Sequence, residues 1–291
     1  MERRMKVAVT HDGIFHADDV FAAVVVRRMF PRVRIIRTRH PDHLAAADLR
    51  FDVGGKSDGA TDFDHHQPGG AGVRPNGVPY AAAGLVWLAF GARLTSSASV
   101  ALEVDRTLFQ SIDAHDNGYA LTKPCADGMT VTVSHVISRM NPDWQEAANY
   151  DACFAQASAL AATILDRTIV RAVGIVQAER EVMVAIQNAD DPRILVLDRF
   201  LPWQETVCTL APTALFVVFP SMGTWRVQAV PQQIGMPGNR RSLPAAWAGL
   251  EGSALQAITG VSEATFAHRG LFIAGAASKA GAYALAQKAL Q

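Results

Sequence analysis

Residues 6–19, KVAVTHDGIFHADD, set the pattern that the first half of the chain follows. Lys6–Thr10 is a short apolar run, which predicts a buried strand. Asp18–Phe30 follows as a predicted helix with an apolar stripe, closed by Pro31. Two histidines, His11 and His16, lie between the end of the strand and the start of the helix. A buried strand that leads through polar residues into a helix is typical of α/β proteins.

The same alternation continues to about residue 118. Further strands are predicted at 33–38, 49–53 and 61–63, and helices at 43–47, 80–92 and 99–116. Alternating strands and helices favour a doubly wound, mostly parallel sheet with helices on both faces. Ligands of such sheets bind beyond the carboxyl ends of the strands, and His11, Asp52 and Asp64 lie at or near such ends.

The second half of the chain has a different texture. Residues 144–188 are predicted to be helical, as one long helix or two. Strands are then predicted at 194–198, 214–219 and 225–230, with a strand pair around 264–276 and helices at 243–259 and 278–290. We therefore expect a domain with a helical connector at 1–191 and a smaller α+β domain at 192–291. The polar stretch Asp190–Arg193 contains a proline and is the predicted hinge, with the active site expected in the cleft between the domains.

Composition indicates a globular protein with an uneven charge distribution. Of 291 residues, 49% are apolar and 19% are charged, and the formal net charge is zero. From Arg193 to the end there are eight Lys and Arg against four Asp and Glu, a net charge of +4, which leaves −4 for the rest. This distribution predicts an anion-binding second domain beside an acidic, metal-binding first domain.

The cysteines and the apolar runs indicate where the protein works. Cys125, Cys153 and Cys208 are odd in number and far apart, which argues against a disulfide framework or a thiolate zinc site. The opening MERRMKVAVTHDG is too short for a signal peptide, and the longest apolar run is too short for a membrane span. We expect a cytoplasmic protein without a membrane partner.

Seven of the nine histidines lie between His11 and His115, within four polar clusters or near them. Each cluster alone has a structural interpretation, such as a turn after a strand or, at Asp116–Gly118, a helix end. Together they would gather many carboxylates in one crevice, where mutual repulsion raises their pKa values unless cations are present. Imidazole and carboxylate ligands without thiolate suit Mn²⁺, Fe²⁺, Co²⁺ or Zn²⁺ better than Mg²⁺. The clusters are Thr10–Asp19, Asp52–Gly55, Asp62–Gln67 and Ser111–Gly118.

These motifs resemble the Myg-one (melanocyte-proliferating-gene) exonuclease family of the DHH phosphoesterase superfamily. That superfamily includes family II inorganic pyrophosphatases, RecJ-type exonucleases and nano-RNases. The resemblance covers nearly the whole chain, with Asp19 where Glu is usual and His115 where an apolar residue is common. The matching stretches are THDGIFHADD at 10–19, DVGG at 52–55, DHHQ at 64–67, AAGLVW at 82–87, DNG at 116–118, RSLPAAWAGL at 241–250 and HRGLFIAGAASK at 268–279.

The resemblance implies a DHH-type domain with two divalent metal ions, Mn²⁺ first and Mg²⁺, Co²⁺ or Zn²⁺ as alternatives. Asp52 would bridge the two metals, and His16 stands where the superfamily usually has Asp. Of the catalytic residues His66, His11 and Asp64, His66 would face the substrate phosphate and Asp64 would orient His65. The implied metal ligands are His11, His16, Asp18, Asp52, His65 and Asp116, with Asp113 as the alternative to Asp116.

The implied function is a metal-dependent phosphodiesterase that removes nucleotides from the 3′ end of RNA or short oligonucleotides. One alternative is a pyrophosphatase or small-molecule phosphatase, and another is a metal-stabilised nucleic-acid-binding scaffold with little turnover. A homodimer is left open. Trp225 and Phe272 are candidates for base stacking or for core packing. The predicted substrate contacts are Arg240, Arg241, His268, Arg269 and Lys279.

Overall fold

The computed structural model describes residues 5–119 and 130–291, so Cys125 lies outside the described residues. The chain divides into two compact units, Met1–Val173 and Gly174–Gln291. The first unit contains β1 (Val7–Thr10), α1 (Ala17–Met29), β2 (Arg34–Arg37), α2 (Pro41–Ala46), β3 (Leu49–Phe51), β4 (Asp62–Phe63), α3 (Ala82–Thr95), α4 (Ala98–Val104), the π-helical turn η1 (Asp105–Phe109), α5 (Gln110–Asp116), α6 (Val133–Ser138) and the start of α7 (Tyr150–Gln187).

The sheet of the first unit is parallel throughout, with the strand order β2-β1-β3-β4. This confirms the expected α/β character and the parallel sheet. The interior strand β1 contains Ala8 and Val9, both fully buried, which fits the apolar run from which the strand was predicted. The chain adds β2 on one side of β1 and β3 on the other, so the order reverses between β1 and β3. Parallel sheets open a crevice at such a reversal, beyond the carboxyl ends of the strands.

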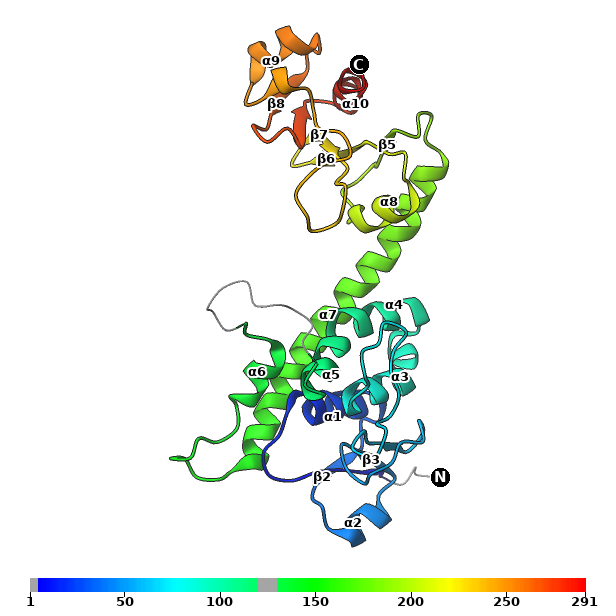
Figure 1. Ribbon diagram of the computed structural model, residues 1–291, viewed down its shortest axis with the longest axis vertical. Coiled ribbons are helices and arrows are strands. Elements are labelled where there is room, and N and C mark those ends of the chain that lie inside the picture. Colours follow the sequence, from blue (N-terminus) through cyan, green and yellow to red (C-terminus); the bar gives the residue numbers. More distant parts are fainter. Residues whose placement is uncertain (1–4, 120–129) are drawn as a thin grey trace. The chain divides into compact units, whose positions relative to one another are not determined.

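Helices α1, α3 and α5 pack against one another, and α3 also contacts β3 and β4 (Figure 1). Val20, Phe21 and Val25 of α1 are completely buried in this packing. The predicted helix at 99–116 is a continuous helical stretch, but η1 interrupts its regular turns between α4 and α5.

A buried ion network fixes α3 against η1 and α5. Arg74 Nη2 donates to Asp105 Oδ1 and to Asp113 Oδ2, both at 2.7 Å. The other oxygen of Asp113 accepts a hydrogen bond from Gly84 N at 3.0 Å. Because Gly84 has no side chain, the carboxylate of Asp113 can approach the backbone of α3 directly.

The second unit is built on a mixed sheet in the order β5-β6-β7-β9-β8, with one parallel pair between β5 and β6. This agrees with the expected α+β texture. Among the described residues of the whole chain, no helix combines the length and apolarity that crossing a bilayer requires. The elements of the unit are β5 (Ile194–Val196), α8 (Gln204–Leu210), β6 (Phe216–Ser221), β7 (Thr224–Ala229), the 3₁₀ turn η2 (Ala245–Trp247), α9 (Gly252–Thr259), β8 (Ala264–Ala267), β9 (Ile273–Ala276) and α10 (Lys279–Ala289).

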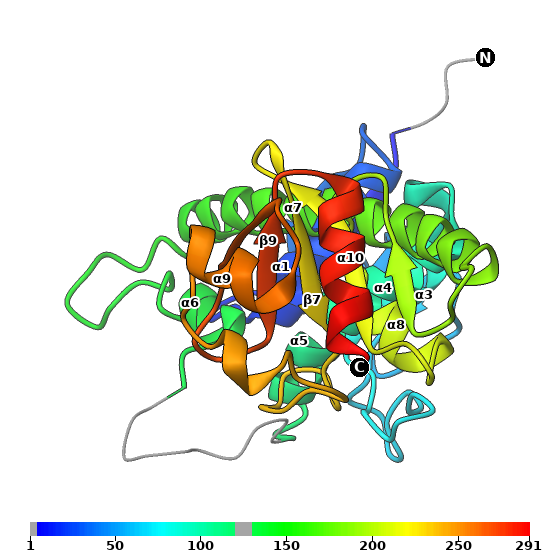
Figure 2. The same ribbon diagram turned by 90° about the horizontal axis from the view of Figure 1, so that it is seen from above.

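Strand β6 shows how both faces of this sheet are covered. Phe216 and Val218 belong to a core with α9 and α10, whereas Val217 and Phe219 belong to a core with α8 and the end of α7. Alternate side chains of a strand point to opposite faces, so one apolar run serves two cores. Figure 2 shows α10 lying across β7, in agreement with the contacts of α10 with β6, β7 and β9.

The helix predicted at 243–259 is wrong in its first half. The structure has η2, then an irregular connection, and α9 begins only at Gly252. Gly249, which lies between η2 and α9, has a φ of 72°, which a right-handed helix cannot contain. No sequence pattern predicted α8, a short helix of seven residues.

The Arg74–Asp113 network makes Gly84 a test of this packing. In Gly84→Ala, the new Cβ would overlap Asp113 Oδ2 and lie 2.6 Å from Arg74 Nη2. We expect urea unfolding to show a loss of about 3 kcal/mol, because a buried ion pair must shift. The control is Gly174→Ala, where nothing lies within 4 Å and a gain of about 1 kcal/mol is expected from helix propensity. Equal stability of Gly84→Ala and wild type would contradict this packing.

Candidate metal centre

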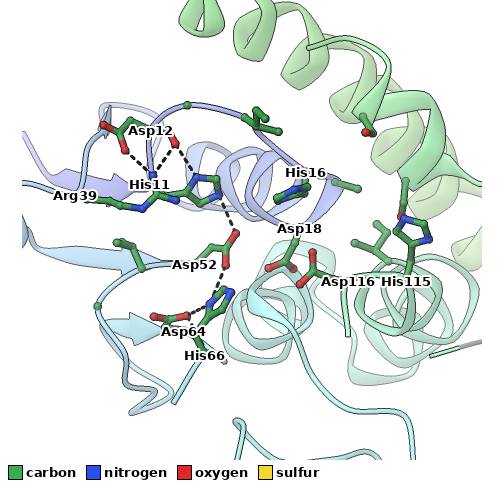
Figure 3. Close-up of a pocket in the computed structure, with 18 residues that line it drawn as sticks. His11, Asp12, His16, Asp18, Arg39, Asp52, Asp64, His66, His115 and Asp116 are labelled. Carbon is green, nitrogen blue, oxygen red and sulfur yellow. Dashed lines mark hydrogen bonds and ion pairs between the residues drawn. The ribbon is translucent and has the colours of Figure 1, made fainter. Parts of the chain in front are cut away.

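Polar residues follow three neighbouring strands of the parallel sheet and meet at one edge. His11 follows β1, Asp52 follows β3 and Asp64 follows β4. His11 Nε2 lies 3.2 Å from Asp52 Oδ2, directly at the strand-order reversal (Figure 3). The edge that the sequence predicted as the ligand site therefore carries an imidazole and two carboxylates.

The backbone of Asp52 adopts a left-handed conformation, with φ at 54°. Asp tolerates this region better than most residues, because its short polar side chain bonds locally. Asp52 N donates to the carbonyl oxygen of Phe63 at 3.1 Å, which holds the turn against β4. Strained backbone of this kind is concentrated at functional sites. Here it directs the Asp52 carboxylate into the cluster.

The His65 ring faces three carboxylates. Its Nε2 lies 3.1 Å from Asp116 Oδ2, 3.6 Å from Asp52 Oδ1 and 3.7 Å from Asp18 Oδ2. The side chain of His65 is only 7% exposed. Three carboxylate oxygens converge around one nitrogen here, and those of Asp52 and Asp18 lie beyond hydrogen-bond distance. Such an arrangement leaves space for a cation among its ligands.

Asp18 is held in place by the start of α3. Its two oxygens accept hydrogen bonds from Ala82 N at 2.9 Å and from Ala83 N at 2.6 Å. Free N–H groups at a helix start attract a carboxylate, and the helix dipole favours the negative charge. The completely buried Asp18 is thus fixed beside His65 by the packing of α1 on α3.

The electrostatics of the cluster are those of carboxylates that lack sufficient cations. Burial, with the charges of Asp52 and Asp116, raises the pKa of Asp18 well above its ordinary value. Burial also raises the pKa of Asp19 to about 7. Although burial alone would lower it, the pKa of His65 is raised to about 11 by the nearby carboxylates of Asp116, Asp52 and Asp18. A protonated imidazole is therefore the counter-charge that the residues themselves can supply.

The donor set fits divalent metal. His65 Nε2, Asp52 Oδ1 and Asp19 Oδ2 are buried and make no hydrogen bond with the described residues. Buried polar atoms normally have partners, and a metal ion supplies one. Among the described residues there are three groups of three residues in which each residue contributes one possible ligand atom, and the three atoms of a group all lie within 4.8 Å of one another. The groups are His11, His16 and Asp52; Asp52, His65 and His66; and Asp18, His65 and Asp116.

The two histidines of the β1–α1 connection are oriented differently. His11 Nδ1 lies 3.1 Å from the carbonyl oxygen of Asp12, which can only accept, so this nitrogen donates and Nε2 faces the carboxylates. His16 is the N-cap residue of α1, and its backbone N–H donates to Asp19 Oδ1 at 2.8 Å. The His16 ring is exposed and lies 6.0 Å from the His11 ring, centroid to centroid.

Asp64 contacts a different histidine ring from the one expected. Its Oδ1 lies 2.7 Å from His66 Nδ1, whereas from His65 it accepts only the backbone N–H, at 2.8 Å. Asp64 Oδ2 accepts a hydrogen bond from Gly55 N at 2.5 Å. The family resemblance implied that Asp64 orients the His65 ring, but the turn after β4 brings Asp64 to the ring of His66.

Asp116 and Asp113, the alternatives for the last ligand, occupy different surroundings. Asp116 ends α5, lines the cavity and lies beside His65. Asp113 is completely buried and is engaged by Arg74 and Gly84. Asp113 is thus committed to the ion network behind the site, and the geometry favours Asp116 as the ligand.

A cavity of about 850 Å³ opens over the cluster (Figure 3). It is also lined by Arg39, His115, Ser134 and Ser138, which the sequence analysis did not assign to the site. Arg39 lies just beyond the end of β2, so its position at a strand end was a usable signal. Ser134 and Ser138 lie on α6, a short helix without a sequence motif, so no sequence signal pointed to them. The rings of His115 and His135 meet edge to face, with centroids 4.7 Å apart.

The cationic residues predicted to bind substrate lie in the second unit and have unequal freedom. Arg240 donates to the carbonyl oxygens of Ala211, Ala214 and Cys208, so it closes the end of α8. Arg241, His268 and Arg269 are exposed, and Lys279 Nζ pairs with the exposed Asp198 at 2.7 Å. The α-helix start expected after Arg241 is only the three-residue η2.

The two aromatic candidates of the second unit also differ. Trp225 is half-buried against the core below α10. Phe272 is 38% exposed, with its ring centroid 4.6 Å from that of His268. Core packing therefore accounts for much of the Trp225 ring, whereas Phe272 keeps an accessible surface.

The parallel sheet and its imidazole–carboxylate cluster define an α/β protein with a candidate metal centre at a strand-order reversal. The model of the MYG1 exonuclease family, described as "Uncharacterised protein family (UPF0160)", matches residues 7–290, and the chain belongs to this family. Its placement in the DHH superfamily stays a prediction.

Three relatives illustrate how far the similarity extends. The "MYG1 protein C694.04c" of Schizosaccharomyces pombe is 31% identical, over all of this chain and 98% of its own length. The "MYG1 protein YER156C" of Saccharomyces cerevisiae is 32% identical, over 98% of this chain and 96% of its own. The human "MYG1 exonuclease" is 30% identical, over 97% of this chain and 85% of its own.

If the cluster binds metal, Mn²⁺ should raise the melting temperature of the metal-free protein. A ligand at a hundred times its Kd stabilises the folded state by about 2.7 kcal/mol. Asp52→Asn and His65→Ala should lose most of this rise, and Asn can keep the left-handed backbone at residue 52. The control is Asp42→Asn in α2, whose side chain is 92% exposed. Equal shifts in all four proteins would contradict the assignment.

Proposed function

We propose that this protein is a metal-dependent phosphodiesterase that removes nucleotides from the 3′ end of RNA or short oligonucleotides. The observation that carries the proposal is that two buried atoms beneath an open cavity, His65 Nε2 and Asp52 Oδ1, make no hydrogen bond with any described residue. The name of the human relative, MYG1 exonuclease, supports the nuclease reaction.

The cluster offers enough ligands for two divalent ions, for which Mn²⁺ is our first choice. Asp52 takes part in two of the three ligand groups, which suits a residue shared between two ions. When bound, such ions stabilise charge on a phosphoryl group and lower the pKa of water, so that hydrolysis proceeds near neutral pH. The proposed ligands are His11, His16, Asp18, Asp52, His65 and Asp116.

His66 is suited to contact the substrate. Its side chain is 64% exposed, and Asp64 Oδ1 lies 2.7 Å from its Nδ1. Because Asp64 also accepts backbone N–H groups, it acts as an acceptor and keeps the proton of His66 at Nδ1. The opposite nitrogen, Nε2, is then available to the phosphate or to the leaving oxygen, where a protonated imidazole can donate. Asp64 therefore orients a catalytic histidine.

The size of the cavity favours a nucleotide substrate over pyrophosphate. A volume of about 850 Å³ is in the upper range of small-molecule sites, and pyrophosphate would fill little of it. The residues around the metal ligands include Ile14, Val53 and Ile112, which give apolar surface for a sugar or base.

The exposed cations of the second unit would bind neighbouring phosphates. The first unit carries the acidic cluster, so a polyanion gains little attraction there outside the metals. The net charge of +4 from Arg193 onward supplies the complementary field.

Turnover and folding should be separable. Asp52→Asn, His65→Ala and His66→Ala should lower the hydrolysis of labelled RNA by at least about 100-fold, because each removes a ligand or a proton donor. Their circular dichroism spectra should stay those of wild type. His43→Ala, an exposed histidine of α2 outside the cavity, is the control and should keep full activity. Labelled DNA and pyrophosphate, tested in parallel, identify the substrate class. Wild-type rates in Asp52→Asn would remove the basis of the proposal.

The two neighbouring arginines of the second unit should separate binding from stability. Arg241→Ala, and likewise Lys279→Ala, should weaken oligonucleotide binding by about 1–3 kcal/mol and reduce its salt dependence. Arg240→Ala should instead lower the melting temperature, because three carbonyl oxygens lose their donor. Titration of labelled oligonucleotide at several salt concentrations measures the first effect. Equal affinities and salt slopes for Arg241→Ala and wild type would show that Arg241 is surface charge alone.

A further inference from the structure

We propose that Arg39 binds a second phosphate group of the substrate, next to the phosphate that is held at the metal ligands. This inference rests on the proposed phosphodiesterase function and adds a specificity-determining residue to it. The contact would be made by the free edge of the Arg39 guanidinium.

The position of Arg39 follows from the pairing of β1 and β2. The strands are parallel with Thr10 opposite Arg37, and Thr38 N donates to the Thr10 carbonyl oxygen at 2.8 Å. The residue after Thr38 is therefore brought beside the residues after Thr10, which are His11 and Asp12. Figure 3 shows Arg39 next to both, at the rim of the site.

One end of the guanidinium is anchored and the other is free. Arg39 Nη1 donates to the Asp12 carbonyl oxygen at 2.8 Å and to Asp12 Oδ1 at 2.6 Å. Its Nε and Nη2 make no hydrogen bond with the residues that the structure describes. The side chain is 61% exposed and lines the same cavity as His11 and Asp52. Asp12 thus fixes the group without occupying the edge formed by Nε and Nη2.

Arg37, two residues earlier, shows what a purely structural arginine looks like here. Its side chain is only 5% exposed, and it donates to the Gly13 carbonyl oxygen and to Asp151. Its guanidinium also lies 4.6 Å from the centre of the Phe154 ring. Arg37 braces the β1–α1 connection from inside, whereas Arg39 braces it with one nitrogen and presents the others to the cavity.

The charge of the cavity explains why an arginine is needed there. Among the described residues that line it, Arg39 is the sole Arg or Lys, and Asp12, Asp18, Asp52, Asp64 and Asp116 are acidic. Apart from the metals and the histidines, an anion would otherwise meet only carboxylates and uncharged groups there. The free edge of a guanidinium matches two oxygens of a phosphate in a forked hydrogen bond, which lysine cannot reproduce.

The test compares the dinucleoside monophosphate ApA with the same compound bearing a phosphate at its 5′ end or at its 3′ end. Wild-type protein with Mn²⁺ should prefer one of the phosphorylated forms in kcat/KM. Arg39→Ala and Arg39→Lys should reduce that preference by about 10- to 100-fold, the range for hydrogen bonds to charged groups, and leave ApA nearly unchanged. Arg34→Ala, an exposed arginine of β2 outside the cavity, is the matched control.

Calorimetric binding of the three compounds to Mn²⁺-loaded wild type and Arg39→Ala gives a second measurement. If no compound is hydrolysed but wild type binds one phosphorylated form more tightly and Arg39→Ala does not, the proposed function fails and the role of Arg39 stands. Equal loss on all three compounds, with weaker Mn²⁺ binding, would show that Arg39 only positions the His11 loop. Unchanged discrimination in Arg39→Ala would likewise overturn the inference.

Discussion

The convergence of carboxylates at one edge of a parallel sheet is the constraint on which the site depends. Asp18, Asp19 and Asp52 are all buried within it, together with His11 and His65. Burial raises the pKa values of Asp18 and Asp19, so the ionised forms of these carboxylates are destabilised in the absence of a cation. A divalent cation bound there would remove the repulsion and would be coordinated by the buried atoms that make no hydrogen bond with the described residues. A site of this kind favours metal binding because the folded chain holds the ligands together at an electrostatic cost.

Backbone N–H groups hold several carboxylates of the candidate metal centre in place. The start of α3 donates two N–H groups to Asp18, and the turns after β3 and β4 donate to Asp64. Behind them, the Arg74–Asp113 pair fixes α5 against α3 and so sets the position of Asp116. His11, Asp52 and His65 follow the strands instead of lying within them, which is why we expect their substitution to change activity more than folding.

The second unit differs from the first in where its charged side chains lie. Its sheet is sandwiched between two apolar cores, and its exposed cations lie outside them. Arg240 and Arg241 are adjacent in sequence, yet one is bound to three carbonyl oxygens and the other is exposed. Charge counts over a segment therefore predict a field but not which side chains can meet a ligand.

The sequence by itself determined the parallel α/β sheet and placed His11, Asp52, Asp64 and His65 near its carboxyl edge. Apolar runs followed at once by His or Asp are local signals, and they survive folding because parallel strands align their ends. Asp113 and Asp116 could not be separated in this way, since residues three apart share a helix face. Only the tertiary structure gives them different surroundings, because Arg74 comes from a distant loop and binds Asp113. Three other features also emerge only in the tertiary structure. They are the contact of Asp64 with His66, the division of the helix predicted at 243–259, and the position of Arg39. Its place beside Asp12 depends on the register between two strands, which no local pattern contains.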